Sequence, residues 1–397
     1  MKRLIGYTAA ICLLAITVGC GGVTSSGTLA YVSNSLGTGF TVFTINTDGT
    51  LTKSSISPQN TPAAPKVLQF TANGKWAYFL DEGGANIYAY TRAGNGELTT
   101  KIDSYPTGPN ASSLVISPSS SFIYVAQPST KKLAVYSIDN TTGILSQVGS
   151  SYQIGYAITQ LVMVPGGNVL FGLSPSQQSV LTLTLNTSSG VPTIAGSLPV
   201  GVNPTYMVLA ANGSYLYVLD HTATTPAGAA QCNAAIFGYN VQGSSIPLAM
   251  AGSPFSQNPD AITGVCPTNP VAGVTTNDSK YLFVANQGSH NISAFKISST
   301  TGIAGEPSEV LGSITTVNGI KTSDASPFDC GFGAGTCITP AFTAVSGSNN
   351  ALYVMDTNAS KIFQYRIDQN TGKLRPQNPA SVSAETATSA PTWITIR

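Results

Sequence analysis

The sequence predicts an all-β protein, a seven-bladed β-propeller made of four-stranded antiparallel blades, and three observations lead to this prediction. First, a strand rich in Val and aromatic residues recurs seven times, with its aromatic residue at positions 31, 78, 124, 171, 217, 283 and 353. Second, the first four steps between these positions are 47, 46, 47 and 46 residues, and the last two are 66 and 70. Third, no segment after the N-terminal leader has a helical period, whereas 40 Gly and 24 Pro supply many turns. A period near 46 with four strands per repeat is typical of propeller blades.

Each repeat contains the same parts, and residues 276–297 form the most regular copy. A Pro or small residue opens a first strand (A), a polar turn leads to the aromatic strand (B), and a short loop leads to strand C. A weaker strand D follows, often after a Thr-Gly turn. The chain begins its first repeat at strand B, near Leu29, and ends with residues 391–397, which match a strand A. We therefore expect the C-terminal strand to pair beside residues 29–32 and close the ring, which removes an open sheet edge.

The first twenty residues predict export. Lys2 and Arg3 precede an apolar run, residues 4–18, that is too short for a membrane span. The run ends at Cys20, and this segment resembles a bacterial lipoprotein signal, although Thr17 stands where Leu is usual. An ordinary secretory signal is the alternative. The predicted organisation is residues 1–19 as signal peptide, 20–27 as lipidated Cys20 with a tether, and 28–397 as a single propeller domain. Gly21 in place of Asp favours the outer membrane, so we expect anchoring by lipid alone on the periplasmic or surface face.

Four cysteines remain in the exported domain: Cys232, Cys266, Cys330 and Cys337. An even number in an exported chain predicts two disulfides. Cys232 and Cys266 fall in two long loops on one face of the ring and can pair, and the other two can close a small loop. The spacings contain no CxxC pair, so we expect no metal site.

Composition excludes several function classes. Charged residues are only 8% of the chain and the formal net charge is +1, so a basic groove for nucleic acid is not available. No P-loop, HExxH or Ser-His-Asp spacing is present, and no cofactor is expected. We expect a monomer that binds a small molecule, a glycan or an envelope protein.

The insertions that lengthen the last repeats gather on one face of the predicted propeller. Strand direction places the B–C loops and the D–A connections together, and we call this side the upper face. The long segments are residues 221–234, 244–269 and 312–339. Insertions concentrated on one face favour a binding surface, and neutral loop growth is the alternative.

Aligning the A strands gives the residues near the upper mouth of the central channel. Three aromatic residues in this set, Tyr206, Phe342 and Trp393, are candidates for a platform under a sugar or another flat ligand; packing between blades is the alternative. Lys66 and Gln160 are the polar ligand-binding candidates at the same level.

Candidate catalytic residues are few, because the chain has only two histidines. His221 follows Asp220, and His290 lies in a Gly-Ser-His-Asn turn, so either is a weak candidate for a general base. An exposed loop histidine without a role is the alternative. Five B strands end on Asn or Asp, which favours turn capping for these residues over catalysis. They are Asn34, Asp81, Asp220, Asn286 and Asp356.

The repeat Pro-x-x to Asn-Gly-x-Tyr-Leu-Tyr-Val, followed by Thr-Gly-x-Leu, resembles the lactonase-type seven-bladed propellers, the family of bacterial 6-phosphogluconolactonase, and the related YVTN-repeat propellers. The resemblance covers nearly all of residues 28–397 and implies a lactonase-like hydrolase if the chain is an enzyme. It also implies active-site motifs, from which this sequence departs. Thr205 and Tyr206 stand where the family has Arg-His, and Gln287 stands where it has Arg. Because opening a lactone needs a base and an oxyanion partner, these changes argue against 6-phosphogluconolactonase activity.

Three hypotheses follow from the sequence. The first is a lipid-anchored propeller that binds a ligand or protein through its upper-face loops. The second is an exported hydrolase of a lactone or sugar-derived substrate, and the third is a scaffold in an envelope complex.

Overall fold

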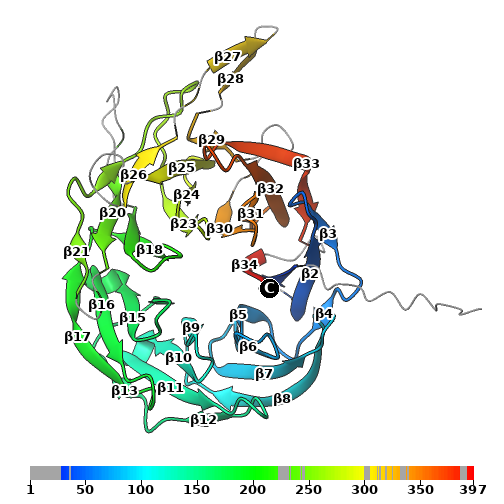
Figure 1. Ribbon diagram of the computed structural model, residues 1–397, viewed down its shortest axis with the longest axis vertical. Coiled ribbons are helices and arrows are strands. Elements are labelled where there is room, and N and C mark those ends of the chain that lie inside the picture. Colours follow the sequence, from blue (N-terminus) through cyan, green and yellow to red (C-terminus); the bar gives the residue numbers. More distant parts are fainter. Residues whose placement is uncertain are drawn as a thin grey trace, which may run out of the picture.

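Seven antiparallel sheets stand around a central channel in the computed structural model (Figure 1). The structure describes residues 28–34, 37–221, 232, 234–241, 243, 246–298, 305–310, 312, 314–317, 320–323, 325–330, 337, 339–384 and 391–397. The predicted signal peptide and tether, residues 1–27, lie outside the described residues. The fold prediction, seven four-stranded blades, is confirmed.

The strands of each blade run in the order A, B, C, D from the channel outward, and the outer strand of some blades is split in two. Blade 1 contains β34 (Pro391–Ile396), β1 (Leu29–Asn34), β2 (Gly39–Ile45), β3 (Leu51–Lys53) and β4 (Gln59–Asn60). Blade 2 contains β5 (Pro65–Phe70), β6 (Trp76–Asp81), β7 (Asn86–Arg92) and β8 (Leu98–Pro106). Blade 3 contains β9 (Ser113–Ile116), β10 (Phe122–Gln127), β11 (Lys132–Ile138), β12 (Leu145–Gln147) and β13 (Tyr152–Gln153). Blade 4 contains β14 (Gln160–Met163), β15 (Val169–Ser174), β16 (Ser179–Leu185) and β17 (Pro192–Pro199).

The remaining blades follow the same order. Blade 5 contains β18 (Pro204–Leu209), β19 (Tyr215–Asp220), β20 (Ala234–Asn240), β21 (Leu248–Ala249) and β22 (Phe255–Ser256). Blade 6 contains β23 (Pro270–Thr275), β24 (Tyr281–Asn286), β25 (Asn291–Ser298), β26 (Glu306–Glu309) and β29 (Phe328–Asp329). Blade 7 contains β30 (Pro340–Val345), β31 (Ala351–Asp356), β32 (Lys361–Ile367) and β33 (Leu374–Ser383). Two short 3₁₀ turns, η1 (Pro128–Thr130) and η2 (Pro175–Gln177), and the hairpin β27 (Ile314–Val317) and β28 (Ile320–Ser323) complete the described elements.

The C-terminal strand closes the ring as predicted. β34 pairs antiparallel with β1, with Tyr31 opposite Thr395 and Val32 opposite Ile394. Beyond the ladder, the Leu29 and Arg397 backbones exchange two hydrogen bonds, of 2.6 and 2.7 Å. The first and last segments of the domain therefore hold each other in blade 1, and no A strand is missing from the ring.

The hydrophobic core lies between blades as well as within them. The second strands are buried along their whole length, for example β6 and β24. One core cluster joins Tyr78 and Leu80 of blade 2 to Ile123 and Val125 of blade 3. Because both faces of each blade are covered by its neighbours, strands without an adjacent helix can carry apolar residues on both sides.

Tyrosines of the second strands also connect neighbouring blades by hydrogen bonds. The Tyr31, Tyr78 and Tyr217 hydroxyls each donate to a glycine carbonyl in the C–D turn of the next blade, at 2.6, 2.9 and 2.7 Å. The Tyr353 hydroxyl of blade 7 donates to the Gly49 carbonyl of blade 1 at 2.7 Å and so spans the closure. These bonds explain why an aromatic second strand and a glycine turn recur together along the sequence.

The structure changes the prediction for one of the three insertions. Within residues 312–339, the hairpin β27–β28 leaves the outer edge of blade 6 between the two halves of its split outer strand, β26 and β29, and projects away from the ring (Figure 1). It is not part of the upper face. The sequence could not show this, because a split outer strand leaves a two-residue element, β29, that no periodicity reveals.

Both predicted disulfides are present. Cys232 pairs with Cys266 across 34 residues, and Cys330 pairs with Cys337 across 7 residues. The first joins the blade 5 B–C connection to the segment between blades 5 and 6, and the second closes a small loop before β30. Covalent closure restricts the unfolded chain in segments that contribute little core.

Candidate functional site

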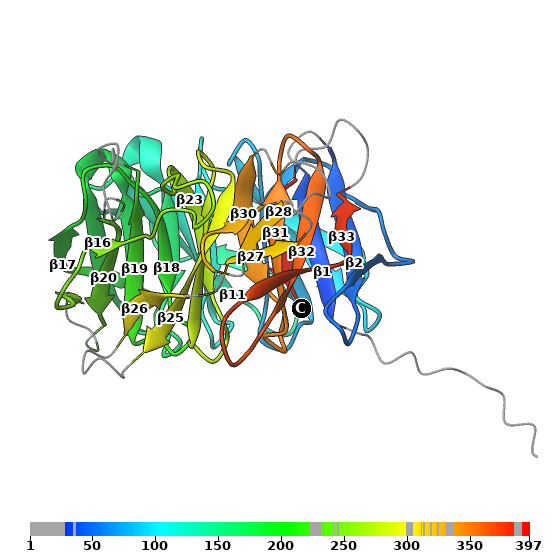
Figure 2. The same ribbon diagram turned by 90° about the horizontal axis from the view of Figure 1, so that it is seen from above.

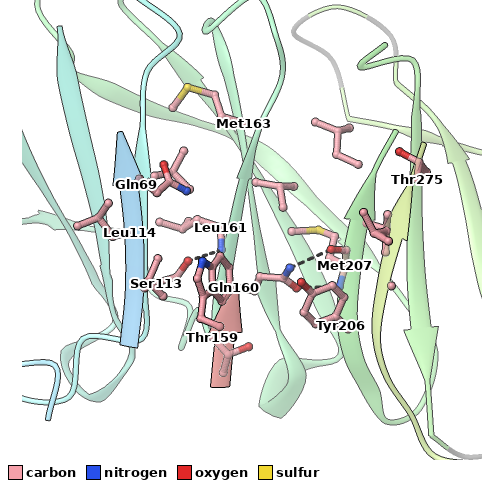
Figure 3. Close-up of a pocket in the computed structure, with 18 of the residues that line it drawn as sticks. Gln69, Ser113, Leu114, Thr159, Gln160, Leu161, Met163, Tyr206, Met207 and Thr275 are labelled. Atoms are coloured by element: carbon pink, nitrogen blue, oxygen red, sulfur yellow. Dashed lines mark hydrogen bonds between the residues drawn. The ribbon is translucent and has the colours of Figure 1, made fainter. Parts of the chain in front are cut away.

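A cavity of about 630 Å³ occupies the central channel (Figure 3). The innermost strands β5, β9, β14, β18, β23 and β34 line it, together with the turns that follow some of them. Among the described residues that line the cavity, none is charged. The polar groups are hydroxyls and amides, from Gln69, Ser112, Ser113, Thr159, Gln160, Thr205, Tyr206 and Thr275. The cavity is therefore suited to an uncharged molecule.

Several of these polar side chains bridge neighbouring innermost strands. The Gln160 amide both donates to the Met207 carbonyl at 2.9 Å and accepts from the Met207 N–H at 2.7 Å (Figure 3). Gln69 accepts from the Ile116 N–H at 3.0 Å, and Ser113 accepts from the Leu161 N–H at 3.1 Å. The innermost strands of neighbouring blades do not pair with each other, so some of their backbone groups lack a strand partner. These side chains bind those backbone groups instead. Gln160 thus has a structural task in addition to its predicted ligand contact, which stays a prediction.

The three aromatic candidates meet in the channel, although they come from three different blades. The Phe342 and Trp393 rings lie 4.4 Å apart between centroids at 37°, and the Tyr206 and Phe342 rings lie 6.4 Å apart at 78°. We call these three residues the aromatic cluster. Tyr206 and Trp393 line the cavity directly. β18 and β30 each begin with a β-bulge, where the register shifts between the opening Pro and the aromatic residue. Such a bulge changes the direction in which the next side chain points, here that of Tyr206 and of Phe342.

The aromatic cluster presents flat apolar surface with two polar atoms. The Trp393 indole N–H donates to the Thr395 Oγ1 at 2.9 Å, so its orientation is fixed. Burial raises the pKa of the Tyr206 phenol, which is therefore neutral at physiological pH. All three side chains are partly buried, which leaves ring surface open to a ligand. Such surface binds planar or weakly polar faces, including those of sugar rings, by stacking.

Lys66 lies at the channel mouth but not among the residues that line the cavity. Burial raises the pKa of the neighbouring Glu82, and the Lys66 ammonium opposes this rise. The lysine charge is thus close to a carboxylate, and this contact is an alternative to its predicted role with a ligand.

The Asp220 carboxylate is occupied by backbone groups. Its Oδ2 accepts from the Val202 and Asn203 N–H groups at 2.7 and 2.8 Å. His221 is exposed, and its own backbone N–H donates to the Asn203 carbonyl at 2.9 Å. Asp220 therefore fixes the loop that enters blade 5, as the capping interpretation expects.

The His290 side chain interacts with one carboxylate, that of Asp329, which the sequence did not connect with it. Burial and the Asp260 carboxylate raise the pKa of Asp329, and the His290 side chain opposes this rise. Asp329 belongs to β29, and its partner Asn291 follows His290 directly. Of the two histidines, His290 is thus the one whose side chain interacts with a carboxylate from another strand.

Of the other strand-ending residues, Asp81 and Asp356 also cap turns. The side-chain amides of Asn34 and Asn286 instead donate to neighbouring side chains, Thr41 for the first and Asn291 and Ser293 for the second. Asp81 accepts from the Ala85 and Asn86 N–H groups at 2.7 and 3.1 Å. Asp356 accepts from the Ala359 N–H at 2.9 Å. The capping role is a consequence of position, because each residue ends a second strand where the chain turns back.

A partly buried carboxylate that the sequence did not single out lies at the outer edge of blade 6. Glu309 accepts from the Ser326 hydroxyl at 2.5 Å and from the Asn258 N–H. Burial raises the pKa of Glu309 to about 7, and these two hydrogen bonds oppose the rise. Only the fold brings residues 258, 309 and 326 together, so no local signal could have predicted the contact.

Among the described residues, no group of three or more His, Cys, Asp or Glu side chains is arranged to hold a metal ion. In the same part of the chain, no helix is long and apolar enough to cross a bilayer.

Comparison with known proteins supports a lactonase-like propeller. Residues 21–162 match the family model described as lactonase, 7-bladed beta-propeller. No curated protein sequence matches the chain. A proposed 6-phosphogluconolactonase from Bacteroides uniformis superposes with a TM-score of 0.70 at 14% identity, covering 94% of this chain and 100% of that one.

A second similar structure is the periplasmic gluconolactonase of Pseudomonas aeruginosa, with a TM-score of 0.67 at 15% identity over 93% of this chain and 98% of the other. A proposed 6-phosphogluconolactonase from Bacteroides fragilis has a TM-score of 0.68 at 14% identity over 94% and 99%. At these identities the likeness shows the fold. The fold is therefore that of the lactonase-like seven-bladed propellers, and the fold resemblance inferred from the repeat is confirmed.

Proposed function

We propose that this protein is an exported, lipid-anchored propeller that binds an uncharged ligand with a flat face, such as a sugar or lactone ring, in the upper part of its channel. The observation that carries the proposal is the aromatic cluster, in which Phe342 packs against both Tyr206 and Trp393 and the three side chains come from three blades. A ligand stacked on Trp393 would exchange hydrogen bonds with the hydroxyls and amides of the cavity wall. The uncharged lining favours a neutral ligand over a phosphorylated one, because a phosphate needs basic partners.

The proposed attachment to the membrane rests on the predicted signal peptide, residues 1–19, and on Cys20. Acylation of Cys20 would attach the ring to the outer membrane through residues 20–27, without a membrane-spanning segment. An envelope protein rather than a small ligand is the other possible partner, and the long segments of the upper face would then form the contact.

Hydrolysis of a lactone is the second candidate function. It is favoured by the family model that matches residues 21–162 and by the name of the similar Pseudomonas aeruginosa protein. In this chain the base would be His290, whose side chain interacts with Asp329, rather than His221, whose neighbour Asp220 binds backbone N–H groups.

A paired binding and turnover experiment separates the two functions. The purified protein is titrated with neutral mono- and disaccharides and with gluconolactone, and lactone opening is followed in parallel. Binding without turnover that is lost in Trp393→Ala and retained in the matched surface variant Lys132→Ala supports the first function. Turnover lost in His290→Ala and retained in His221→Ala supports the second. Binding that is unchanged in Trp393→Ala and Tyr206→Ala would exclude the channel as the site.

A further inference from the structure

The two faces of the ring differ in charge. The lower face consists of the A–B and C–D turns, and it lies opposite the insertions. Under blades 7, 1 and 2 it carries six basic residues at turns or strand ends, which we call the basic sector: Lys75, Arg92, Arg366, Lys373, Arg375 and Arg397. Three acidic residues share this sector: Asp48, Glu97 and Asp368.

The rest of the lower face is not basic. Among the described residues of blades 3, 4 and 5, the lower turns contain Asp139 and no Lys or Arg. In blade 6, Lys280 and Asp278 form an ion pair of 3.1 Å, and Lys296 and Glu306 add one basic and one acidic residue at the same end of the strands. The upper face has a mixed balance. Glu82, Asp260 and Asp329 have exposed surface there, as do the basic residues Lys66, Lys131, Lys132 and Lys361, and three further carboxylates are buried beneath the face: Asp81, Asp220 and Asp356.

The basic groups are held at the lower surface by defined contacts. Arg397 donates to the Ala72 carbonyl at 2.5 Å, and Arg92 donates to the Tyr31 hydroxyl at 3.0 Å. Arg366 and Arg375 are exposed and lie directly opposite each other in the β32–β33 register. Like charges in this position repel, so an anion placed between them would be stabilising.

A hollow of about 530 Å³ lies at this arginine pair, with Asn350, Gln369 and Asn370 also lining it. The Asp368 carboxylate in its wall is bound to its own turn, because the Asn370 and Thr371 N–H groups donate to it at 2.9 and 3.1 Å. These contacts, and to a lesser extent the charge of Arg375, hold the pKa of Asp368 below its usual range. The hollow therefore offers two guanidinium groups and side-chain amides, which is donor chemistry suited to a phosphate group.

The chain enters the ring at the centre of the basic sector. β1 starts at Leu29 on the lower face in blade 1, between blades 7 and 2. The C-terminus lies beside it, toward the lower rim in Figure 2. If Cys20 carries lipid, residues 20–27 reach at most about 28 Å even when fully extended. The sector that surrounds the attachment point would then be the part of the ring nearest the bilayer.

We propose that the basic sector rests on a surface of anionic phospholipid, so that the lower face points toward the membrane and the upper face with the channel mouth points away. This orientation rests on the proposed lipid attachment, but the electrostatic contact itself does not need it. Anionic headgroups attract basic residues within about one Debye length, so the contact is sensitive to salt.

Vesicle sedimentation of the full chain carrying Cys20→Ser tests the contact without the acyl group. Vesicles of phosphatidylcholine with one quarter phosphatidylglycerol should bind this variant in low salt, and vesicles of phosphatidylcholine alone should not. Adding Arg366→Glu and Arg375→Glu should weaken binding by at least about 25-fold, at about fivefold for each basic residue lost, because the added carboxylates are also repelled by the anionic headgroups. The matched control, Lys131→Glu with Lys132→Glu on the upper face, makes the same change in net charge and should bind as the parent does.

Equal weakening by the upper-face control would overturn the proposal, because net charge alone would then explain binding. Equal binding to both kinds of vesicle would also overturn it. Displacement by 10 mM inorganic phosphate at constant ionic strength would mean that the hollow is a site for a free anion and not for a lipid surface. Mass spectrometry of the wild-type chain tests acylation of Cys20 separately, so failure of the anchor and failure of the docking surface are distinguishable.

Discussion

The hydrogen bond from Tyr353 to Gly49 joins blade 7 to blade 1, and its removal should measurably loosen the ring. The Tyr353→Phe substitution deletes only the hydroxyl, whose bond to the Gly49 carbonyl is 2.7 Å long and buried. A typical intramolecular hydrogen bond contributes about 1 kcal/mol net, and the loss lies between about 1 and 3 kcal/mol where its removal leaves a buried acceptor unsatisfied. We therefore expect a loss of about 1–2 kcal/mol in the free energy of unfolding.

Chemical denaturation measures this loss directly. The urea midpoint of Tyr353→Phe should fall while the slope of the transition stays the same, since the surface exposed on unfolding does not change. Tyr88→Phe is the matched control, because the Tyr88 ring stacks on Phe79 and its hydroxyl has no hydrogen-bond partner in the described part of the chain. If Tyr353→Phe and Tyr88→Phe have the same midpoint, the tyrosine-to-turn bonds do not stabilise the ring and the reasoning fails.

Three further predictions concern stability. The pKa of Glu309 is about 7 in the folded protein and 4.5 without the fold, so the folded state binds the proton more tightly. Stability should therefore fall by up to about 3 kcal/mol as pH rises from 4.5 to 7 and stay level above, and Glu309→Gln should remove this part of the slope in denaturation curves at several pH values. Replacing Cys232 and Cys266 by Ser should lower stability by about 1.4 kcal/mol more than opening the disulfide that spans 7 residues, because the closed loop is longer; equal losses would refute the chain-entropy reasoning. Deleting residues 391–397 should abolish cooperative melting, and a single sharp transition in calorimetry would contradict ring closure by β34.

The regular part of this fold could be predicted from the sequence because the repeat is local. The first four steps between aromatic second strands are 46 or 47 residues, and the two longer steps keep the same strand pattern, so the count of blades and the closing strand follow from the repeat. The partner of each tyrosine could not be predicted in this way. Tyr353 and Gly49 are 304 residues apart, and only the closed ring brings them together.

The repeat also predicts which residues reach the candidate site, but it does not predict the contacts that they make there. Tyr206, Phe342 and Trp393 occupy equivalent positions in their strands, so their approach in the channel follows from the ring. Gln160 occupies an equivalent position too, but its amide bonds to the Met207 backbone, which depends on where the ladder ends between two blades. The approach of Asp329 to His290 depends on a two-residue strand after the hairpin, which no sequence pattern announces.

The central claim, that the aromatic cluster binds a neutral ligand, has a direct optical test because the chain has only two tryptophans. Trp76→Phe leaves Trp393 in the channel as the only tryptophan, so its fluorescence reports on the site. Titration with neutral sugars and lactones should give a saturable change in Trp393 emission for one of them, and Tyr206→Ala should abolish that change. A ligand that binds the protein with no change in Trp393 emission, or with the same change after Tyr206→Ala, would contradict the account.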